Sequence, residues 1–393
     1  MRTVGLYLSG RPDNGGSYQY WLAMLKSVAE LDKQKYEVKL FYKNIQWRKL
    51  AEKYGLTMIE LKEKRGVLYS LAERMLWRFP DSLWGDIISW LSMDLKKIKK
   101  ENLDIFVSNS VNGIGDILGI PTIVPIFDLM HRYEEAIEVK QEYLGRDKFY
   151  LHQCQYAELI LVDSNVGKEQ VLECYGESKN DLADRIEVLP FIPPDYIYNV
   201  SSTNKIKYEL FDKYLFYPAQ FWTHKNHIRL LEVIDNLNKE NLDINLVLVG
   251  SEQNNKNNVE YEINKRHLEK NVKILGYVSN EEMVYLYKHA RALIMPTLFG
   301  PTNIPQLEAF ELGCPVATSR IYGIPEQVGD AALLFNPRSV EEMQQAVRRI
   351  WTDDELCKTL IKRGRQKAES WNQKQFGIRV GEILERYFDN NNY

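Results

Sequence analysis

The strongest indication of a functional site lies in residues 292–310, where an apolar run ends in a loop rich in Gly, Pro, Thr and Asn. A helix is expected to begin after Asn303 and to end before Gly313. We predict that Asn303 caps this helix through its side-chain oxygen, with Gln306 reaching back as in a capping box. The free amides at such a helix start suit an anion, and phosphate above all.

Glu308 lies about one turn inside the same expected helix. A carboxylate at that place could accept hydrogen bonds from the vicinal hydroxyls of a ribose. It could equally be a surface side chain on a well-capped core helix. The residues of this stretch leave both interpretations open.

Three further groups fall where ligands of open α/β sheets bind, beyond the carboxyl ends of the strands. Lys225 follows an expected strand and precedes a helix, and an ammonium at that place can neutralise a diphosphate. Asp128 and His131 follow the expected strand 122–128 and could contact a sugar or act as general acid and base. The alternative is an Asp that caps the next segment beside a solvated His.

Gly15 and Gly16 follow the first expected strand and allow a ligand close to the backbone, with Ser17 expected to cap the next helix. A plain turn is the alternative. Residues 113–118 nearly match the dinucleotide-binding pattern, but Leu118 replaces the third glycine, so we interpret them as a chance match in a turn. The histidines form no ligand set with cysteines or carboxylates, so neither a metal nor another cofactor is predicted.

These groups are positioned by short apolar strands that alternate with helical patterns, which is typical of α/β proteins with doubly wound parallel sheets. The expected strands are 3–9, 37–42, 104–109, 122–128, 159–164 and 186–189, then 215–219, 245–250, 272–278, 292–296, 315–319 and 332–335. A segment rich in Pro, Ser and Asn separates the two groups of strands. We predict two Rossmann-like domains, residues 1–195, completed by a C-terminal helix at about 373–393, and residues 205–372.

Composition argues against several classes of protein. The net charge of -3 gives no electrostatic case for a nucleic-acid partner. The four cysteines are scattered without a CxxC pair, which indicates the reduced thiols of a cytosolic protein. No apolar stretch approaches the ~20 residues of a membrane-spanning helix. We therefore expect a cytoplasmic protein that is free or bound peripherally at the membrane face.

Residues 73–100 carry apolar side chains at helical spacing and end in a lysine-rich run. One interpretation is a helix in a membrane interface, with tryptophans at headgroup depth. We favour the other, a crossover helix before strand 104–109, because parallel strands require such a connection.

Several windows together resemble one protein family. In the second half they are residues 217–227, 272–279, 299–316 and 323–332, and in the first half they are residues 15–16 and 127–131. They are similar to the GT-B glycosyltransferases of the large retaining group (family four) that includes bacterial mannosyl- and glucosyltransferases. The resemblance implies two Rossmann-like domains that face a cleft, the first for the acceptor and the second for a nucleotide sugar.

The resemblance also implies roles for individual residues. It assigns catalysis to Asp128 and His131. It assigns donor binding to Gly15, Gly16, Gln220, Lys225, Tyr277, Val278, Thr302, Asn303, Ile304 and Glu308. Lys225 would bind the diphosphate, Glu308 the ribose, and the reaction would retain the anomeric configuration without a metal ion. The donor would be GDP-mannose or a UDP-sugar, and the acceptor a cell-surface polysaccharide or a lipid-linked glycan.

Three positions depart from the family pattern. Gln220 stands where many members carry Arg, Gly300 where many carry a second Glu, and Phe127 where a His usually precedes the Asp. These departures motivate an alternative, a non-catalytic subunit of the same fold that binds a nucleotide sugar or a glycan. An epimerase or a phosphorylase would be a third function, but no additional motif indicates one.

Overall fold

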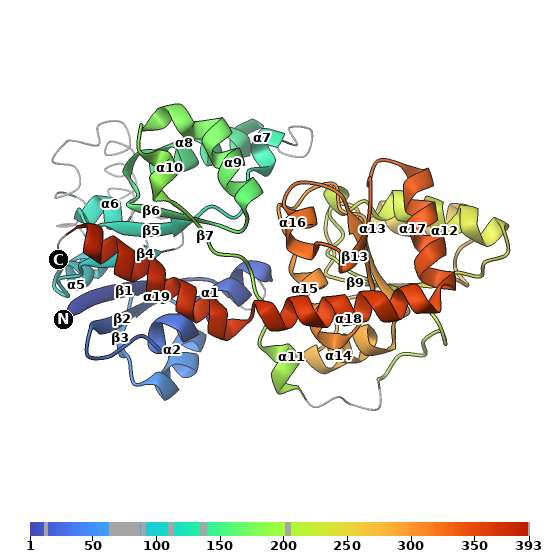
Figure 1. The fold of residues 1–393 in the computed structure, drawn as a ribbon, viewed down its shortest axis with the longest axis horizontal. Coiled ribbons are helices and arrows are strands. Elements are labelled where there is room, and N and C mark those ends of the chain that lie inside the picture. Colours follow the sequence, from blue (N-terminus) through green and yellow to red (C-terminus); the bar gives the residue numbers. More distant parts are fainter. Residues whose placement is uncertain are drawn as a thin grey trace.

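The computed structural model describes residues 1–11, 15–62, 87, 92–108, 114–133, 140–200 and 206–391. They form two parallel β-sheets, each covered by helices on both faces, which lie side by side along the long axis of the molecule (Figure 1). The fold is therefore α/β with two doubly wound, Rossmann-like domains.

The first sheet has the strand order β3-β2-β1-β4-β5-β6-β7, and all its neighbours are parallel. Its strands are β1 (Arg2–Leu8), β2 (Tyr36–Tyr42), β3 (Thr57–Glu60), β4 (Ile105–Ser108), β5 (Thr122–Pro125), β6 (Leu159–Val162) and β7 (Ile186–Val188). Its helices are α1 (Gly16–Ala29), α2 (Ile45–Ala51), η2 (Glu52–Tyr54), α5 (Met93–Lys99), α6 (Ile114–Leu118), α7 (Met130–Tyr133), α8 (Lys140–Tyr156), α9 (Asn165–Tyr175), η5 (Gly176–Ser178) and α10 (Leu182–Arg185).

Alternate side chains of β1 show how both faces of this sheet are buried. Leu6 packs in one core with α1, α2 and the C-terminal helix α19 (Gln373–Asn390), whereas Tyr7 packs in another with α5 and α6. The C-terminal helix contributes Phe376 and Phe388, both fully buried, to the core under α1. The last helix of the chain thus packs on the first domain (Figure 1).

The second sheet has the order β10-β9-β8-β11-β12-β13, again with parallel neighbours. Its strands are β8 (Leu215–Pro218), β9 (Leu246–Val249), β10 (Val272–Ile274), β11 (Ala292–Met295), β12 (Val316–Ser319) and β13 (Ala332–Phe335). Its helices are η6 (Thr223–Lys225), α12 (His227–Lys239), α13 (Lys256–Lys265), α14 (Asn280–His289), α15 (Ile304–Leu312), α16 (Ile324–Val328), α17 (Val340–Thr352) and α18 (Asp354–Ser370).

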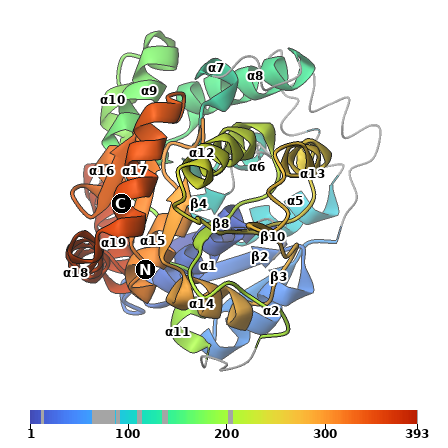
Figure 2. The ribbon, with the colours of Figure 1, turned by 90° about the vertical axis from the view of Figure 1, so that its right-hand side faces the viewer.

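A short helix, α11 (Tyr196–Asn199), follows the first sheet and packs against α14 and α15 of the second domain. It lies at the edge of the second domain away from α12, α13 and α17 (Figures 1 and 2). None of the helices in the described part of the chain has the length and hydrophobicity of a membrane-spanning segment.

Every expected strand is present, usually shorter at its C-terminal end, and one strand was missed. β3 is an edge strand that is nowhere fully buried and ends in Glu60, so it lacks the continuous apolar run by which the other strands were recognised. Residues 114–118 are the helix α6 rather than the expected turn. Of the expected helix at 73–100, most residues lie outside the described part, and α5 at its end precedes β4.

Candidate active site

The loops that face each other between the domains all follow strands. The glycine loop after β1 and the loop after β6 come from the first domain, and the loops after β8, β11 and β12 come from the second. Because the carboxyl ends of parallel strands meet at one edge of a sheet, these loops bring distant residues together.

The start of α15 differs in detail from the capping box that the sequence predicts. Asn303 is the N-cap residue, with extended backbone, but its side chain makes no capping hydrogen bond. Its amide donates to Oε1 of Gln327 at 2.9 Å, and its carbonyl accepts from Nε2 of Gln327 at 2.8 Å. Gln306 donates instead to Oγ1 of Thr318 at 2.9 Å. The prediction of the cap position was right and that of its hydrogen bonds was wrong.

The buried Nδ2 atom of Asn303 has no hydrogen-bond partner among the described residues. Nearby, Gly300 has φ 141°, a conformation that side chains other than glycine rarely adopt, and a Cβ there would lie 2.9 Å from Nδ2 of Asn303. The loop that precedes α15 is therefore built for glycine at this position. The family's glutamate does not fit this backbone without a rearrangement.

Lys225 ends η6, next to the α15 loop. Asn226 follows it, with its backbone in the left-handed region. Its Nδ2 donates to the carbonyls of Pro296, at 3.0 Å, and Pro337, at 2.9 Å. The amide of Leu298 donates to the carbonyl of His224 at 2.7 Å. These bonds tie the lysine loop to the loop that leads into α15.

The ammonium of Lys225 makes no hydrogen bond or ion pair with any residue that the structure describes. Burial lowers its pKa to about 8, and the negative charge of Asp128 acts in the opposite direction. The carboxylate of Asp128 in the first domain and the ammonium of Lys225 in the second domain therefore interact electrostatically. Such a half-buried cation is well placed to receive an anionic ligand.

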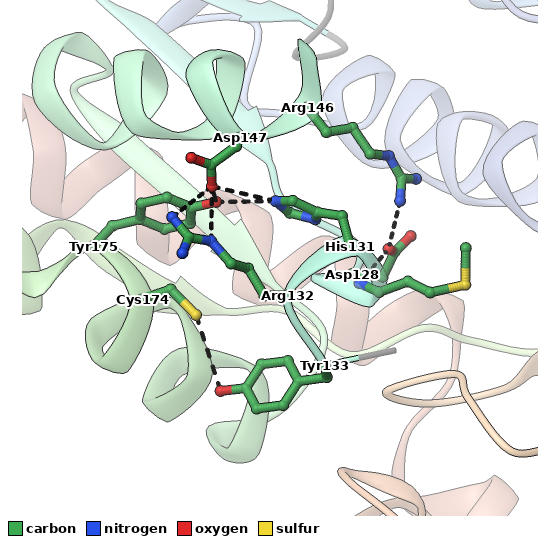
Figure 3. Close-up of polar contacts among 9 residues, drawn as sticks. Asp128, His131, Arg132, Tyr133, Arg146, Asp147, Cys174 and Tyr175 are labelled. Carbon is green, nitrogen blue, oxygen red and sulfur yellow. Dashed lines mark hydrogen bonds and ion pairs between the residues drawn. The ribbon is translucent and has the colours of Figure 1, made fainter. Parts of the chain in front are cut away.

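Asp128 and His131 point in different directions from the segment after β5 (Figure 3). Asp128 accepts from the amide of Met130 at 3.0 Å and pairs with Nη1 of Arg146 at 3.3 Å. His131 is fully buried, with Nε2 3.1 Å from the hydroxyl of Tyr175. Burial lowers the pKa of the imidazole. Of the two side chains, only that of Asp128 is partly exposed.

Asp147 anchors this segment from α8. Its Oδ1 lies 3.6 Å from Nε2 of His131, 2.6 Å from Nη2 of Arg132 and 2.9 Å from the hydroxyl of Tyr175 (Figure 3). His131 thus holds α7 against α8 and α9. Nothing in the local sequence shows which face of α8 meets the segment after β5.

The glycine loop of the first domain meets the start of α15. Gly15 is the N-cap residue of α1, with φ 58°, so the helix begins before Ser17, and the prediction that Ser17 caps it was wrong. A Cβ on Gly16 would lie 3.0 Å from Cδ1 of Ile304. Two residues that were assigned to donor binding from opposite halves of the chain are therefore adjacent.

Glu308 is buried rather than a surface side chain. Its Oε1 accepts from the hydroxyl of Tyr196 at 2.8 Å and its Oε2 from the hydroxyl of Tyr287 at 2.6 Å. Burial raises the pKa of this carboxyl, and the two tyrosines act to lower it.

The remaining assigned residues lie at different depths. Gln220 is exposed and its Oε1 accepts from Nε1 of Trp222 at 2.9 Å. Tyr277 is 82% exposed, whereas Val278 beside it is buried. Thr302 donates across the domain interface to Oδ2 of Asp163 at 2.5 Å.

Two acidic residues at this interface were missed by the sequence analysis. Asp163 follows β6 and is buried, and burial raises its pKa to about 6. Glu326 of the second domain accepts from the amides of Asn165, at 3.0 Å, and Val166, at 3.3 Å, at the start of the first-domain helix α9. Both line a cavity of about 190 Å³ between the domains. Nothing in their local sequence shows that they meet across two domains.

Residues 201–367 match the family model described as Glycosyl transferases group 1. This match covers most of the second domain. The O-antigen chain mannosyltransferase B of Escherichia coli is 26% identical over 274 residues, which are 63% of this chain and 70% of that protein. The serotype-specific mannosyltransferase WbdA of Escherichia coli is 23% identical over 243 residues, 56% of this chain and 28% of that longer protein.

Solved structures show the same fold over the whole chain. The crystal structure of HepE from Anabaena, in complex with UDP-glucose, matches with a TM-score of 0.70 at 14% identity and covers 98% of this chain and 100% of its own. The fold is GT-B. The family match over the second domain and the mannosyltransferase relatives support a glycosyltransferase that uses a nucleotide sugar. Among the described residues, no group of three His, Cys, Asp or Glu side chains is placed to hold a metal ion.

Proposed function

We propose that this glycosyltransferase moves mannose from GDP-mannose to a growing cell-surface polysaccharide of the O-antigen type. The proposed donor site rests on one observation. The half-buried Lys225, which lacks a hydrogen bond to any described residue, lies within the field of Asp128 and is tied to the loop before α15. The choice of mannose is supported by the relatives named above, which are mannosyltransferases. A UDP-hexose is the other donor to test.

The leaving diphosphate would be stabilised by Lys225 and by backbone amides of Thr302, Asn303 and Ile304, because donors fixed before the reaction act most strongly on developing charge. Gly16 would let the first domain approach the same phosphates. Glu308 would hold the ribose, and the loop with the exposed Tyr277 and the buried Val278 would meet the base. The role proposed for Gln220 is a neutral hydrogen bond where many relatives carry a charge.

Asp128 would contact the transferred sugar or the acceptor, since its carboxylate is partly exposed and lies near Lys225. His131, assigned to catalysis from the sequence, is proposed here as a positioning residue, because its buried imidazole holds α7 in place. We propose retention of the anomeric configuration, as in the family that the windows resemble, with no step assigned to a metal.

The test is transfer of labelled mannose from GDP-mannose, and of glucose from UDP-glucose, by the purified chain to lipid-linked glycan acceptors. We expect turnover with one donor and its loss in Lys225→Ala and Glu308→Ala. Lys239→Ala, an exposed lysine of α12, is the matched control. Unchanged turnover in both site variants would refute the site. The anomeric configuration of the product, read by NMR, tests retention.

A non-catalytic binding subunit remains the second candidate, and Gln220, Phe127 and the buried His131 favour it. Tight donor binding without turnover on any acceptor would support it.

We also propose that the protein works in the cytoplasm, at the membrane face that carries a lipid-linked acceptor. All four cysteines are free, as is usual for a reducing compartment. Co-sedimentation with anionic vesicles tests the membrane contact, and absence of binding at low salt would contradict it.

A further inference from the structure

The carboxylate of Glu308 is held from both sides by tyrosines that come from different elements. The hydroxyl of Tyr287, on α14 of the same domain, is 2.6 Å from Oε2. The hydroxyl of Tyr196, on α11, is 2.8 Å from Oε1. Each oxygen therefore accepts one hydrogen bond, and the plane of the carboxylate is fixed by two anchors.

The helix α11 belongs to the connection between the two sheets. Asp195, at its N-cap, forms an ion pair with Lys26 of α1 in the first domain. Tyr198 of the same helix donates to Glu311, on α15 in the second domain. The connection therefore contacts α1 on one side and α15 on the other, and Tyr196 is its contact with the Glu308 carboxylate.

A carboxylate oxygen can accept more than one hydrogen bond, so each oxygen of Glu308 keeps acceptor capacity after its tyrosine is bound. Two vicinal hydroxyls need two acceptors at a fixed separation and in a fixed plane. The two tyrosines supply this orientation before the ligand arrives, which reduces the cost of ordering the carboxylate on binding.

We propose that Tyr196 is a positioning residue for ribose recognition, which makes the affinity for the nucleotide depend on the connection between the domains. The inference rests on the proposed function, in which Glu308 binds the ribose. Tyr287 performs the same task from within the second domain. Tyr196 differs because it couples the ribose site to the connection between the domains, which also contacts α1 through Asp195.

The test compares the full chain with Tyr196→Phe and the matched control Tyr198→Phe, which removes a Tyr–Glu hydrogen bond from the same helix outside the site. The probes are GDP and 2′,3′-dideoxy-GDP, measured by calorimetry, with the uridine pair in their place if the donor screen selects UDP. The dideoxy probe lacks both hydroxyls and cannot sense the orientation of Glu308.

We expect Tyr196→Phe to weaken GDP binding about tenfold, the effect of one hydrogen bond to a charged group. Binding of the dideoxy probe should change less than twofold, so the ratio of the two affinities falls. Tyr198→Phe should leave both affinities as in the unsubstituted chain, and Tyr287→Phe should resemble Tyr196→Phe.

Three results would overturn the inference. The first is an unchanged affinity ratio in Tyr196→Phe, and the second is an equal loss in Tyr198→Phe, which would indicate docking of α11 alone. The third is tighter GDP binding in Tyr196→Phe, which would make Tyr196 a competitor of the ribose. If the unsubstituted chain binds neither GDP nor UDP, the proposed function fails first, and the inference fails with it.

Discussion

At the scale of single residues, the candidate site contains ionisable groups whose pKa values are shifted by burial. Lys225 has a pKa lowered to about 8, Asp163 has one raised to about 6, and the pKa of Glu308 is also raised. Desolvation is the first cause in each case, because burial disfavours the charged form of both acids and bases.

The lowered pKa of Lys225 predicts a pH dependence of donor binding. The ammonium attracts the diphosphate only while it is protonated, so nucleotide affinity should fall as the pH rises from 7 to 9. Lys225→Arg keeps its charge throughout this range and should show a much flatter profile. Calorimetric titration of GDP at several pH values measures both. Parallel profiles of the two proteins would show that another group titrates.

Asp163 predicts a pH dependence of stability. Its pKa in the folded protein lies above the ordinary value of 3.8, so the folded state holds an extra proton between about pH 4 and 6. Its ionised form therefore costs stability above that window, by up to about 3 kcal/mol. Asp163→Asn keeps an acceptor for Thr302 and removes the charge.

We expect Asp163→Asn to unfold at a higher temperature than the unsubstituted protein at pH 7, with the difference shrinking as the pH falls to 4.5. Thermal unfolding followed by circular dichroism measures this. A difference that stays constant with pH would contradict the assignment.

At the scale of elements, most strands follow directly from the sequence, with β3 and the short helix α6 as exceptions, whereas contacts between elements do not. In the second domain, β9 and β11 were predictable because they are continuous apolar runs buried along their whole length. The position of the α15 N-cap was predictable from Asn303, but its partner Gln327 lies on α16 and has no local signal.

The loop before α15 gives a prediction at this scale. Gly300→Ala places a side chain at φ 141°, so we expect a loss of about 1–3 kcal/mol in stability. Gly145→Ala is the control, because this glycine lies within α8 with open space around its Cα, and alanine should stabilise the helix by roughly 0.5–1 kcal/mol. Denaturant unfolding measures both, and a neutral Gly300→Ala would show that the loop tolerates another conformation.

At the scale of the whole molecule, the two domains are connected through the α11 segment and the C-terminal helix and touch through their loops. Sequence patterns predict two Rossmann-like halves and the family's site residues. They do not predict Glu326 at the start of α9, Asp163 beside Thr302, or Tyr196 on Glu308, because each pair is separated by more than a hundred residues. Their meeting depends on how the domains pack.

Glu326 supplies a prediction about this packing. Its carboxylate accepts from two amides at the start of α9, so Glu326→Ala should weaken the contact between the domains and raise the radius of gyration in small-angle scattering. Glu355→Ala, an exposed acidic residue of α18, is the control and should leave the scattering profile unchanged. An unchanged radius in Glu326→Ala would show that this contact does not hold the domains together.

The central claim is a nucleotide-sugar site formed by Lys225, the start of α15 and Glu308. A crystal structure of the full chain with GDP tests it most directly. We predict the diphosphate within hydrogen-bond distance of Nζ of Lys225 and of the amides at 302–304, with the ribose hydroxyls on the Glu308 carboxylate. GDP bound elsewhere, or bound with its ribose away from Glu308, would contradict the account.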